Sequence, residues 1–472
     1  KELAKKNSKN KSAMASQKKV LLDFKENSQF VYGIYRLKTN VLAIFSKDSI
    51  VDKIDHDCYI ALKRTCCYAE AGGQVSDTGM IIGKNFKARL LDVFKAPNGQ
   101  HIHKVKLLDG YISYNDECEI ILDKDRRKRT EANHSSVHML QYALQQCVSS
   151  QIRQAGSYVD GDKLRFDFTY SGKMTDDKII EVENFVNDMI NKQIIISTEV
   201  MPIDKAKQIG AMALFNEKYG DIVRVVKIGK SIELCGGTHA TNTKDILRFA
   251  ISSYESKGSN LYRIEAVTGL KIEDSLFDII KPYNDEMIKL LMKAKEILDE
   301  AKEMGIKLDF DVEIDNSKPT SYKDIIFNRN ELQYIQQEVR DLEKKYITKR
   351  EQQVLANLDI YRERIRDYNG TFGLLMTVCN KDINLLKTVA DAMIEEMGTG
   401  FVFFANVKDD GSVNFLSRSN CHANSGLIVK DAAISSLGNG GGSPTFAQGG
   451  GKTKEFLPKI YTHIEKVLKN EA

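Results

Sequence analysis

The feature that most constrains the fold of this chain is a pair of short motifs that stand far apart: HSSVH at residues 134–138 and CGGTH at residues 235–239. The first motif lies among apolar residues at helical spacing, so His134 and His138 fall on one helix face, one turn apart. The second motif contributes Cys235 and His239, and its glycines let the backbone turn tightly. If these four side chains bind one ion, the chain between the motifs must fold back onto the helix.

One thiolate and three imidazoles form a donor set that suits zinc, whereas calcium and magnesium require oxygen donors. A helical zinc protease carries a glutamate directly after its first histidine, and Ser135 stands there instead, so that class is excluded. Four protein ligands are usual for a structural zinc, while a catalytic zinc keeps a position for water. Both interpretations stay open, including one in which substrate displaces Cys235 or His239.

The first half of the chain changes its hydrophobic periodicity near residue 125. Residues 29–125 alternate short apolar runs with glycine and asparagine turns, which predicts a small β-barrel domain. Residues 126–270 predict a mixed α+β zinc-binding domain, with the first motif on a helix at 132–146. The same domain is expected to hold a strand at 164–168 and a helix at 176–191.

The second half begins with a helical spacer, residues 271–362, in which charged residues surround apolar ones at helical spacing. It predicts two long helices, 275–304 and 330–361, around a loop at 305–323. Residues 363–472 alternate apolar strands with helices and end in the densest glycine cluster of the chain, which indicates a glycine-rich α/β domain. The overall fold class predicted is α+β.

Composition sets looser limits. A length of 472 residues suggests about three domains, and residues 1–28 read as a basic linker arm cut from a longer protein. Eight cysteines at irregular spacing favour a reducing cytoplasm, and no long apolar stretch or signal peptide is present, so we expect a soluble cytoplasmic protein. Because the net charge is only +4, contact with nucleic acid must come from local basic clusters.

Both motifs resemble the paired editing motif of alanyl-tRNA synthetases and of their free-standing editing relatives. Further segments extend this resemblance over nearly the whole chain and liken it to the C-terminal half of the synthetase, without an aminoacylating site. They are YAEAGGQVSDTG (68–79), like the barrel motif that precedes the editing domain; GAMALF (210–215) with EKY (217–219), and RIEAVTG (263–269), like segments within and at the end of that domain; and GGGSP (440–444) with AQGGG (447–451), like the glycine-rich signature of the C-terminal domain.

The resemblance implies a hydrolase that removes serine or glycine wrongly attached to tRNA(Ala), at a site with a zinc ion held by the two motifs. A pocket shaped for a methyl group discriminates weakly against amino acids of similar size, so a second site must correct errors. By the same resemblance, Gln154 falls where the family has a polar residue lining the pocket. The family often has threonine where this chain has Val137, so a hydroxyl that contacts a seryl side chain is missing.

The resemblance also implies RNA contacts. Arg126 and Arg127, within a run of four basic residues before the first motif, are expected to contact phosphates. Backbone amides at Gly440, Gly441 and Gly442, together with Gln448, are expected to contact tRNA, since glycines let RNA approach closely. The family uses this C-terminal domain to bind tRNA and in some members to form a homodimer.

Two alternatives remain at this point. One is a non-catalytic tRNA-binding fragment whose zinc completes the fold. The other is a stand-alone trans-editing deacylase. In the leading interpretation, the parent enzyme ligates alanine to tRNA(Ala) with ATP through a catalytic half that this chain does not contain. The water-activating group and the oligomeric state stay undetermined.

Overall fold

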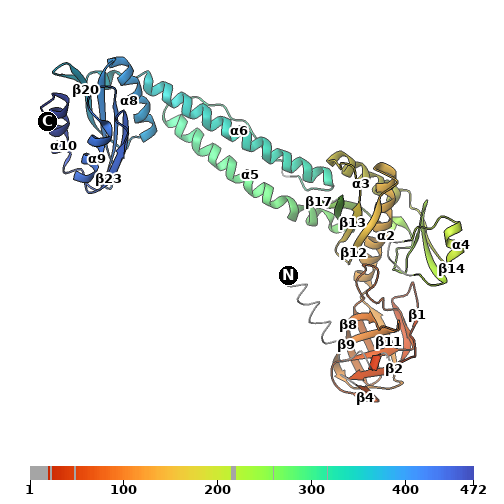
Figure 1. Ribbon diagram of the computed structural model, residues 1–472. Coiled ribbons are helices and arrows are strands. Elements are labelled where there is room, and N and C mark those ends of the chain that lie inside the picture. Colours follow the sequence, from red (N-terminus) through yellow and green to blue (C-terminus); the bar gives the residue numbers. More distant parts are fainter. Residues whose placement is uncertain are drawn as a thin grey trace. The chain divides into compact units, whose positions relative to one another are not determined.

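A computed structural model describes residues 20–21, 24–46, 49–213, 219–258, 260–315 and 317–471 (Figure 1). Most of the predicted linker arm, and residues 214–218 of the motif segment at 210–219, lie outside these ranges. The chain divides into two compact units, one formed by residues 1–286 and 314–332 and the other by residues 287–313 and 333–472.

The first unit begins with a closed β-barrel. A ring of hydrogen-bonded strands runs β2–β5–β9–β8–β7–β11, and β11 pairs back with β2 to close it, while β3 extends the sheet beyond β2. Alternate residues of each strand face the interior, as Phe86, Ala88 and Leu90 do in β8. The predicted barrel is confirmed. Its strands are β1 (Gln29–Phe30), β2 (Arg36–Ser46), β3 (Ser49–Val51), β4 (Lys53–Ile54), β5 (Cys58–Leu62), β6 (Arg64–Thr65), β7 (Gly79–Gly83), β8 (Phe86–Lys95), β9 (His101–Gly110), β10 (Ile112–Ser113) and β11 (Glu117–Leu122).

A mixed domain follows, built on two small antiparallel sheets, β12–β13–β18–β17 and β14–β15–β16. Helices α2 and α3 pack with the first sheet around a core that includes Leu140, Phe166 and Ile264. Its elements are α2 (Lys124–Cys147), β12 (Arg153–Val159), β13 (Leu164–Thr169), α3 (Asp176–Asn191), β14 (Ile196–Pro202), α4 (Ile203–Gln208), β15 (Ile222–Ile228), β16 (Ser231–Leu234), η1 (Thr243–Ile246), β17 (Phe249–Gly258), β18 (Leu261–Thr268) and η2 (Gly269–Lys271).

The first-motif helix is longer than predicted. It begins at Lys124, because the Asp123 carboxylate caps it by accepting a hydrogen bond from the backbone amide of Arg126. The basic run that we expected ahead of the helix therefore forms its first turns. The strand predicted at 164–168 and the helix predicted at 176–191 both appear in the structure.

Two long helices follow, α5 (Ile272–Glu303) and α6 (Tyr322–Leu355). The second was predicted to start at residue 330, which is wrong by about two turns. Its actual start is stabilised by Asp324, whose carboxylate accepts hydrogen bonds from the backbone amide and the hydroxyl of Ser321. The predicted loop at 305–323 is correspondingly shorter. A short helix, α7 (Asp359–Arg362), stands where we expected α6 to end.

The C-terminal part of the second unit is one sheet in the order β19–β20–β21–β22–β24–β23, with β20 and β21 parallel and the other pairs antiparallel. Both faces are covered, since Phe401 and Phe403 of β21 join one core with α9 and α10 while Val402 and Phe404 join another with α8. The elements are β19 (Ile365–Tyr368), β20 (Thr371–Cys379), α8 (Ile383–Met397), β21 (Gly400–Val407), β22 (Val413–Ser419), α9 (Ser425–Ser435), β23 (Asn439–Gly442), β24 (Phe446–Gly451) and α10 (Leu457–Leu468). Over the described ranges, no helix is long and apolar enough to span a bilayer.

Candidate metal centre

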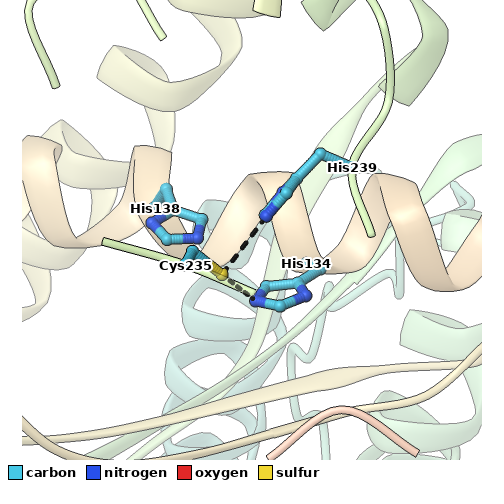
Figure 2. Close-up of side chains that lie close together, drawn as sticks. All are labelled: His134, His138, Cys235 and His239. Carbon is cyan, nitrogen blue, oxygen red and sulfur yellow. Dashed lines mark hydrogen bonds between the residues drawn. The ribbon is translucent and has the colours of Figure 1, made fainter. Parts of the chain in front are cut away.

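The fold brings the two motifs together. His134 and His138 project from α2, Cys235 directly follows β16, and His239 lies four residues further along the chain (Figure 2). One potential ligand atom from each residue lies within 4.8 Å of all the others. The Cys235 sulfur is 3.5 Å from His134 Nε2 and 3.3 Å from His239 Nε2. Nitrogen and sulfur donors around a tetrahedral zinc stand about 3.6 Å apart, so the spacing suits that ion.

The Nδ1 atom of each histidine lies within hydrogen-bond distance of a separate acceptor, which orients the ring. His134 Nδ1 lies 2.7 Å from Gln74 Oε1, and His138 Nδ1 lies 2.6 Å from Glu233 Oε2. His239 Nδ1 lies 3.3 Å from Ser135 Oγ.

Each acceptor is itself held in place. The Gln74 oxygen also accepts from the backbone amide of Thr238, Glu233 also accepts from the Ser231 hydroxyl, and the Ser135 hydroxyl donates to the Glu131 carbonyl.

These contacts assign the proton of each ring. When Nδ1–H donates to these acceptors, the neutral tautomer of each ring leaves the lone pair of Nε2 available to a metal ion. His138 Nε2 is buried and has no hydrogen-bond partner among the residues that the structure describes. A buried nitrogen without a partner is costly, and a metal ion at this point would satisfy it. The residues present therefore fit a zinc ion.

Electrostatics favour the same arrangement. Burial alone raises the pKa of the Cys235 thiol, but the neighbouring His134 and His239 outweigh it and hold that pKa well below its usual range. Burial, followed by the proximity of His134, lowers the pKa of His239 to about 3. A thiolate beside a neutral His239 suits zinc binding. Burial lowers the pKa of His138, but Glu233 and Cys235 outweigh it and raise that pKa to about 10, so zinc binding at this ring would release a proton.

Gly237 makes room for the site. A Cβ at this position would collide with the His134 ring and would press on the Gln74 side chain, whereas a Cβ at Gly236 would meet nothing within 4 Å. The loop is also held by Arg224, whose Nη1 donates to the carbonyls of Cys235 and Gly237 at 2.9 and 2.8 Å. The second glycine of the motif is thus required by side-chain packing rather than by a left-handed backbone.

A cavity of about 390 Å³ opens beside the candidate metal ligands. It reaches His134, His138 and Cys235 but not His239, so a metal here would be accessible from one side. Its walls come from both the mixed domain and the barrel. Among the residues that the structure describes, no aspartate or glutamate lines it, and no side-chain carboxylate is available there as a general base.

Gln154 and Val137 both line this cavity. Gln154 lies in strand β12, and its Nε2 donates to Ser157 Oγ at 3.1 Å. Its side-chain oxygen has no hydrogen-bond partner among the described residues and is available to a ligand hydroxyl. Val137 is 3% exposed and lies between the two histidines of α2. The resemblance pointed to these two positions, and the fold places both at the ligand cavity.

The prediction that Arg127 contacts RNA is wrong. Its side chain is only 1% exposed and forms a buried ion pair with Asp77, while its Nη2 also donates to the Cys66 carbonyl at 2.8 Å. A guanidinium committed in this way cannot reach a phosphate. Arg126 is half-buried and donates from Nη1 to the Ser76 carbonyl at 2.7 Å.

The predicted RNA-contacting glycines belong to the second unit, where they form the hairpin β23–β24. Gly440 lies close to Gly449, and a Cβ on either would press on Ala433 of α9. A Cβ on Gly442 would clash with Phe446 and Ala447 across the hairpin. Gly440 and Gly442 therefore have a packing role, whereas a Cβ on Gly441 would meet nothing within 4 Å. The exposed Gln448 side chain extends from the same hairpin.

Sequence reasoning missed the residues that orient the ligands. Glu233 had a signal, because residues two apart in a strand face the same way and Glu233 stands two before Cys235. Ser135 lies inside the first motif, but its position indicated only that the glutamate of a zinc protease is absent. Gln74 had no local signal, since only the contact between the barrel and the mixed domain brings it to His134.

A multidomain α+β protein with a buried Cys-His₃ group at a cavity is the class that the fold and the site define. Three known families match parts of the chain: tRNA synthetases class II (A) over residues 1–126, the threonyl and alanyl tRNA synthetase second additional domain over residues 223–265, and the DHHA1 domain over residues 373–470.

Relatives that match nearly the whole of this chain include alanine–tRNA ligases. Those of Listeria monocytogenes and Halalkalibacterium halodurans are each 33% identical, over 470 and 471 residues, which is 97% of this chain and 50% of the relative. Among solved structures, the C-Ala domain from Aquifex aeolicus alanyl-tRNA synthetase is 21% identical with a TM-score of 0.21, covering 22% of this chain and 97% of that domain.

The chain belongs to the alanyl-tRNA synthetase family, and it spans about half the length of the curated relatives it matches.

Proposed function

We propose that this chain hydrolyses the ester of tRNA(Ala) wrongly charged with serine or glycine, as the proofreading part of an alanine–tRNA ligase. The observation that carries the proposal is the Cys-His₃ group with its pre-oriented Nε2 atoms at the wall of a cavity of about 390 Å³. Family membership supplies tRNA as the partner. The ligation of alanine would belong to parts of the relatives that this chain does not cover.

Zinc, held by His134, His138, Cys235 and His239, would supply Lewis-acid chemistry at the ester. The chain's own residues shape the site. Val137 presents methyl groups beside the ligands, which limits the room for the amino-acid side chain. Gln154 offers an amide oxygen that can accept a hydrogen bond from a seryl hydroxyl. Walls contributed by two domains restrict the access of bulk water to the ester.

We propose further that tRNA is held by surfaces outside this cavity. Arg126 and the exposed Lys128 and Arg129 lie at the start of α2, and Gln448 extends from the glycine hairpin of the second unit. A homodimer through residues 363–472 and a cytoplasmic location accord with the family and stay proposals.

Deacylation of purified Ser-tRNA(Ala), with the zinc content measured on the same sample, tests the central proposal. Replacing Cys235 by alanine should remove zinc and reduce deacylation to background. Cys147→Ala is the matched control, because this half-buried cysteine is the last residue of α2 and does not line the cavity. This variant should keep both its zinc and its deacylation rate. A zinc-loaded wild-type protein with no rate above background would exclude the hydrolase and favour a structural zinc.

The role of Gln154 has its own test. Gln154→Ala should lower the deacylation of Ser-tRNA(Ala) about tenfold, the usual size of one lost hydrogen bond to a ligand, because it removes the acceptor for the seryl hydroxyl. Gly-tRNA(Ala) has no such hydroxyl and should be hydrolysed at nearly the wild-type rate. Equal losses on both substrates would contradict a contact with the serine side chain.

A further inference from the structure

Three aromatic rings of the barrel line the metal-site cavity, although the barrel core does not use them. Phe30, Tyr32 and His101 gather there, and we call them the aromatic shelf. Phe30 and His101 are stacked at 5.4 Å between centroids with planes 8° apart, and Tyr32 meets Phe30 edge-on at 4.5 Å. Val31, between Phe30 and Tyr32, packs against the barrel core, whereas Phe30 and Tyr32 line the cavity.

The shelf contacts the loop at residues 235–239, which carries Cys235 and His239 and which we call the metal loop. The Tyr32 hydroxyl donates to the Gly236 carbonyl at 2.9 Å, one residue after the ligand Cys235. The Arg224 guanidinium, which holds the same loop, lies 4.3 Å from the centre of the Tyr32 ring. The position of these rings is therefore fixed relative to the metal ligands.

Part of the shelf is open to solvent. Tyr32 is 43% exposed, and Phe30 and His101 are half-buried. Burial, followed by the nearby Lys95 charge, lowers the pKa of His101 to about 4, so its ring is neutral at pH 7. Lys95 also lines the cavity, and it forms no ion pair within the described part of the chain. Flat neutral rings beside a free cation are a combination suited to a nucleotide.

We infer that the aromatic shelf binds the base of the 3′-terminal nucleotide of the RNA, with Lys95 near its phosphate, while the aminoacyl ester lies at the metal ligands. This inference rests on the proposed function, because the scissile ester is attached to the ribose of that nucleotide. Base and ester must then occupy one cavity, and the shelf and three residues of the Cys-His₃ group, His134, His138 and Cys235, line the same cavity. Stacking needs no base-specific hydrogen bond, so the shelf acts through ring contact.

A fluorescence experiment tests the inference without requiring hydrolysis. The chain contains no tryptophan, so Phe30→Trp introduces a single reporter into the shelf. An acceptor-stem RNA that has an intact 3′ end and carries no amino acid should quench the fluorescence of this tryptophan. The same RNA lacking only its terminal nucleotide should bind with about tenfold lower affinity, since one base–aromatic contact is lost. Equal quenching by the two RNAs would overturn the inference.

Two controls define the source of any signal. Tyr114→Trp places the reporter at a residue that is 60% exposed on the barrel and does not line the cavity, and its response should not depend on the terminal nucleotide. AMP alone, at the same concentration as the RNA, should quench Phe30→Trp weakly. Quenching by AMP that equals or exceeds that of the intact RNA would assign the shelf to free nucleotides and overturn the inference.

Deacylation separates this inference from the proposed function. Phe30→Ala should raise the KM for Ser-tRNA(Ala) about tenfold, with the zinc content unchanged. If wild-type protein fails to deacylate, the proposed function is lost while the fluorescence result still stands by itself. If wild-type protein deacylates and the Phe30→Trp reporter ignores the terminal nucleotide, only the shelf is excluded.

Discussion

Glycines cluster in both the metal loop and the C-terminal hairpin, but different neighbours require them. Beside Gly237 lie a polar ring and an amide, His134 and Gln74, whose orientations are set by hydrogen bonds. Beside Gly440 and Gly449 lie each other's backbones and the apolar side chains of α9. An added methyl group at Gly237 would displace the candidate ligand His134, whereas an added methyl group at Gly440 or Gly449 would press α9 away from the sheet. The first change should cost function and the second only stability.

The largest effect is expected in the metal loop. Gly237→Ala should displace His134 and leave the protein with little bound zinc and little deacylation. Gly236→Ala is the matched control, because a Cβ there meets nothing within 4 Å, and it should bind zinc normally. Zinc per chain, measured by elemental analysis, checks both variants. Equal zinc contents in the two variants would show that the loop adjusts to a Cβ at Gly237, and that this glycine is not required for the metal site.

The next largest effect is expected at the buried ion pair between Arg127, in the first turns of α2, and Asp77. Arg127→Met removes the cationic partner of the buried Asp77 carboxylate, and breaking such an ion pair costs about 3–5 kcal/mol. Lys128→Met, at the exposed neighbouring position, should change the unfolding free energy by less than about 0.5 kcal/mol. Urea unfolding measures the difference. If both variants lost stability equally, the Arg127–Asp77 pair would contribute nothing specific.

A smaller effect is expected from the residues that orient the ligands. Glu233→Gln weakens the acceptor of His138 Nδ1, and loss of such an outer partner lowers zinc affinity about 10–100-fold. Glu199→Gln, on the exposed surface of β14, should leave the affinity unchanged. Competition with a chromophoric chelator gives both affinities. A wild-type affinity in Glu233→Gln would show that His138 is oriented by packing alone.

The smallest effect is expected in the hairpin. Gly449→Ala crowds Gly440 and Val429 and should cost about 1–2 kcal/mol of stability, with the zinc content unchanged. Gly450→Ala is the control, since its Cβ would make only ordinary contacts at 3.7 and 3.8 Å. Thermal unfolding, combined with zinc analysis, completes the comparison. Loss of zinc in Gly449→Ala would show that the two regions do not act separately.

Secondary structure was predictable where the local signal was complete. Helix α3 was predicted with its observed bounds, since apolar residues recur at helical spacing behind Thr175, whose hydroxyl caps the helix. The starts of α2 and α6 were predicted too late, because charged residues conceal the periodicity of their first turns. Both starts carried capping signals, Asp123 in one case and Ser321 with Asp324 in the other.

By itself, the sequence determined the candidate metal ligands, the barrel and the family, because spacing along a helix and motif identity are local properties. Only the tertiary structure decided which neighbours those residues have. It buried Arg127 against Asp77, brought Gln74 from the barrel to His134, and placed Phe30 and Tyr32 at the cavity of the metal site. Such contacts join segments distant in the chain, and their free energy depends on burial and packing that no local pattern records.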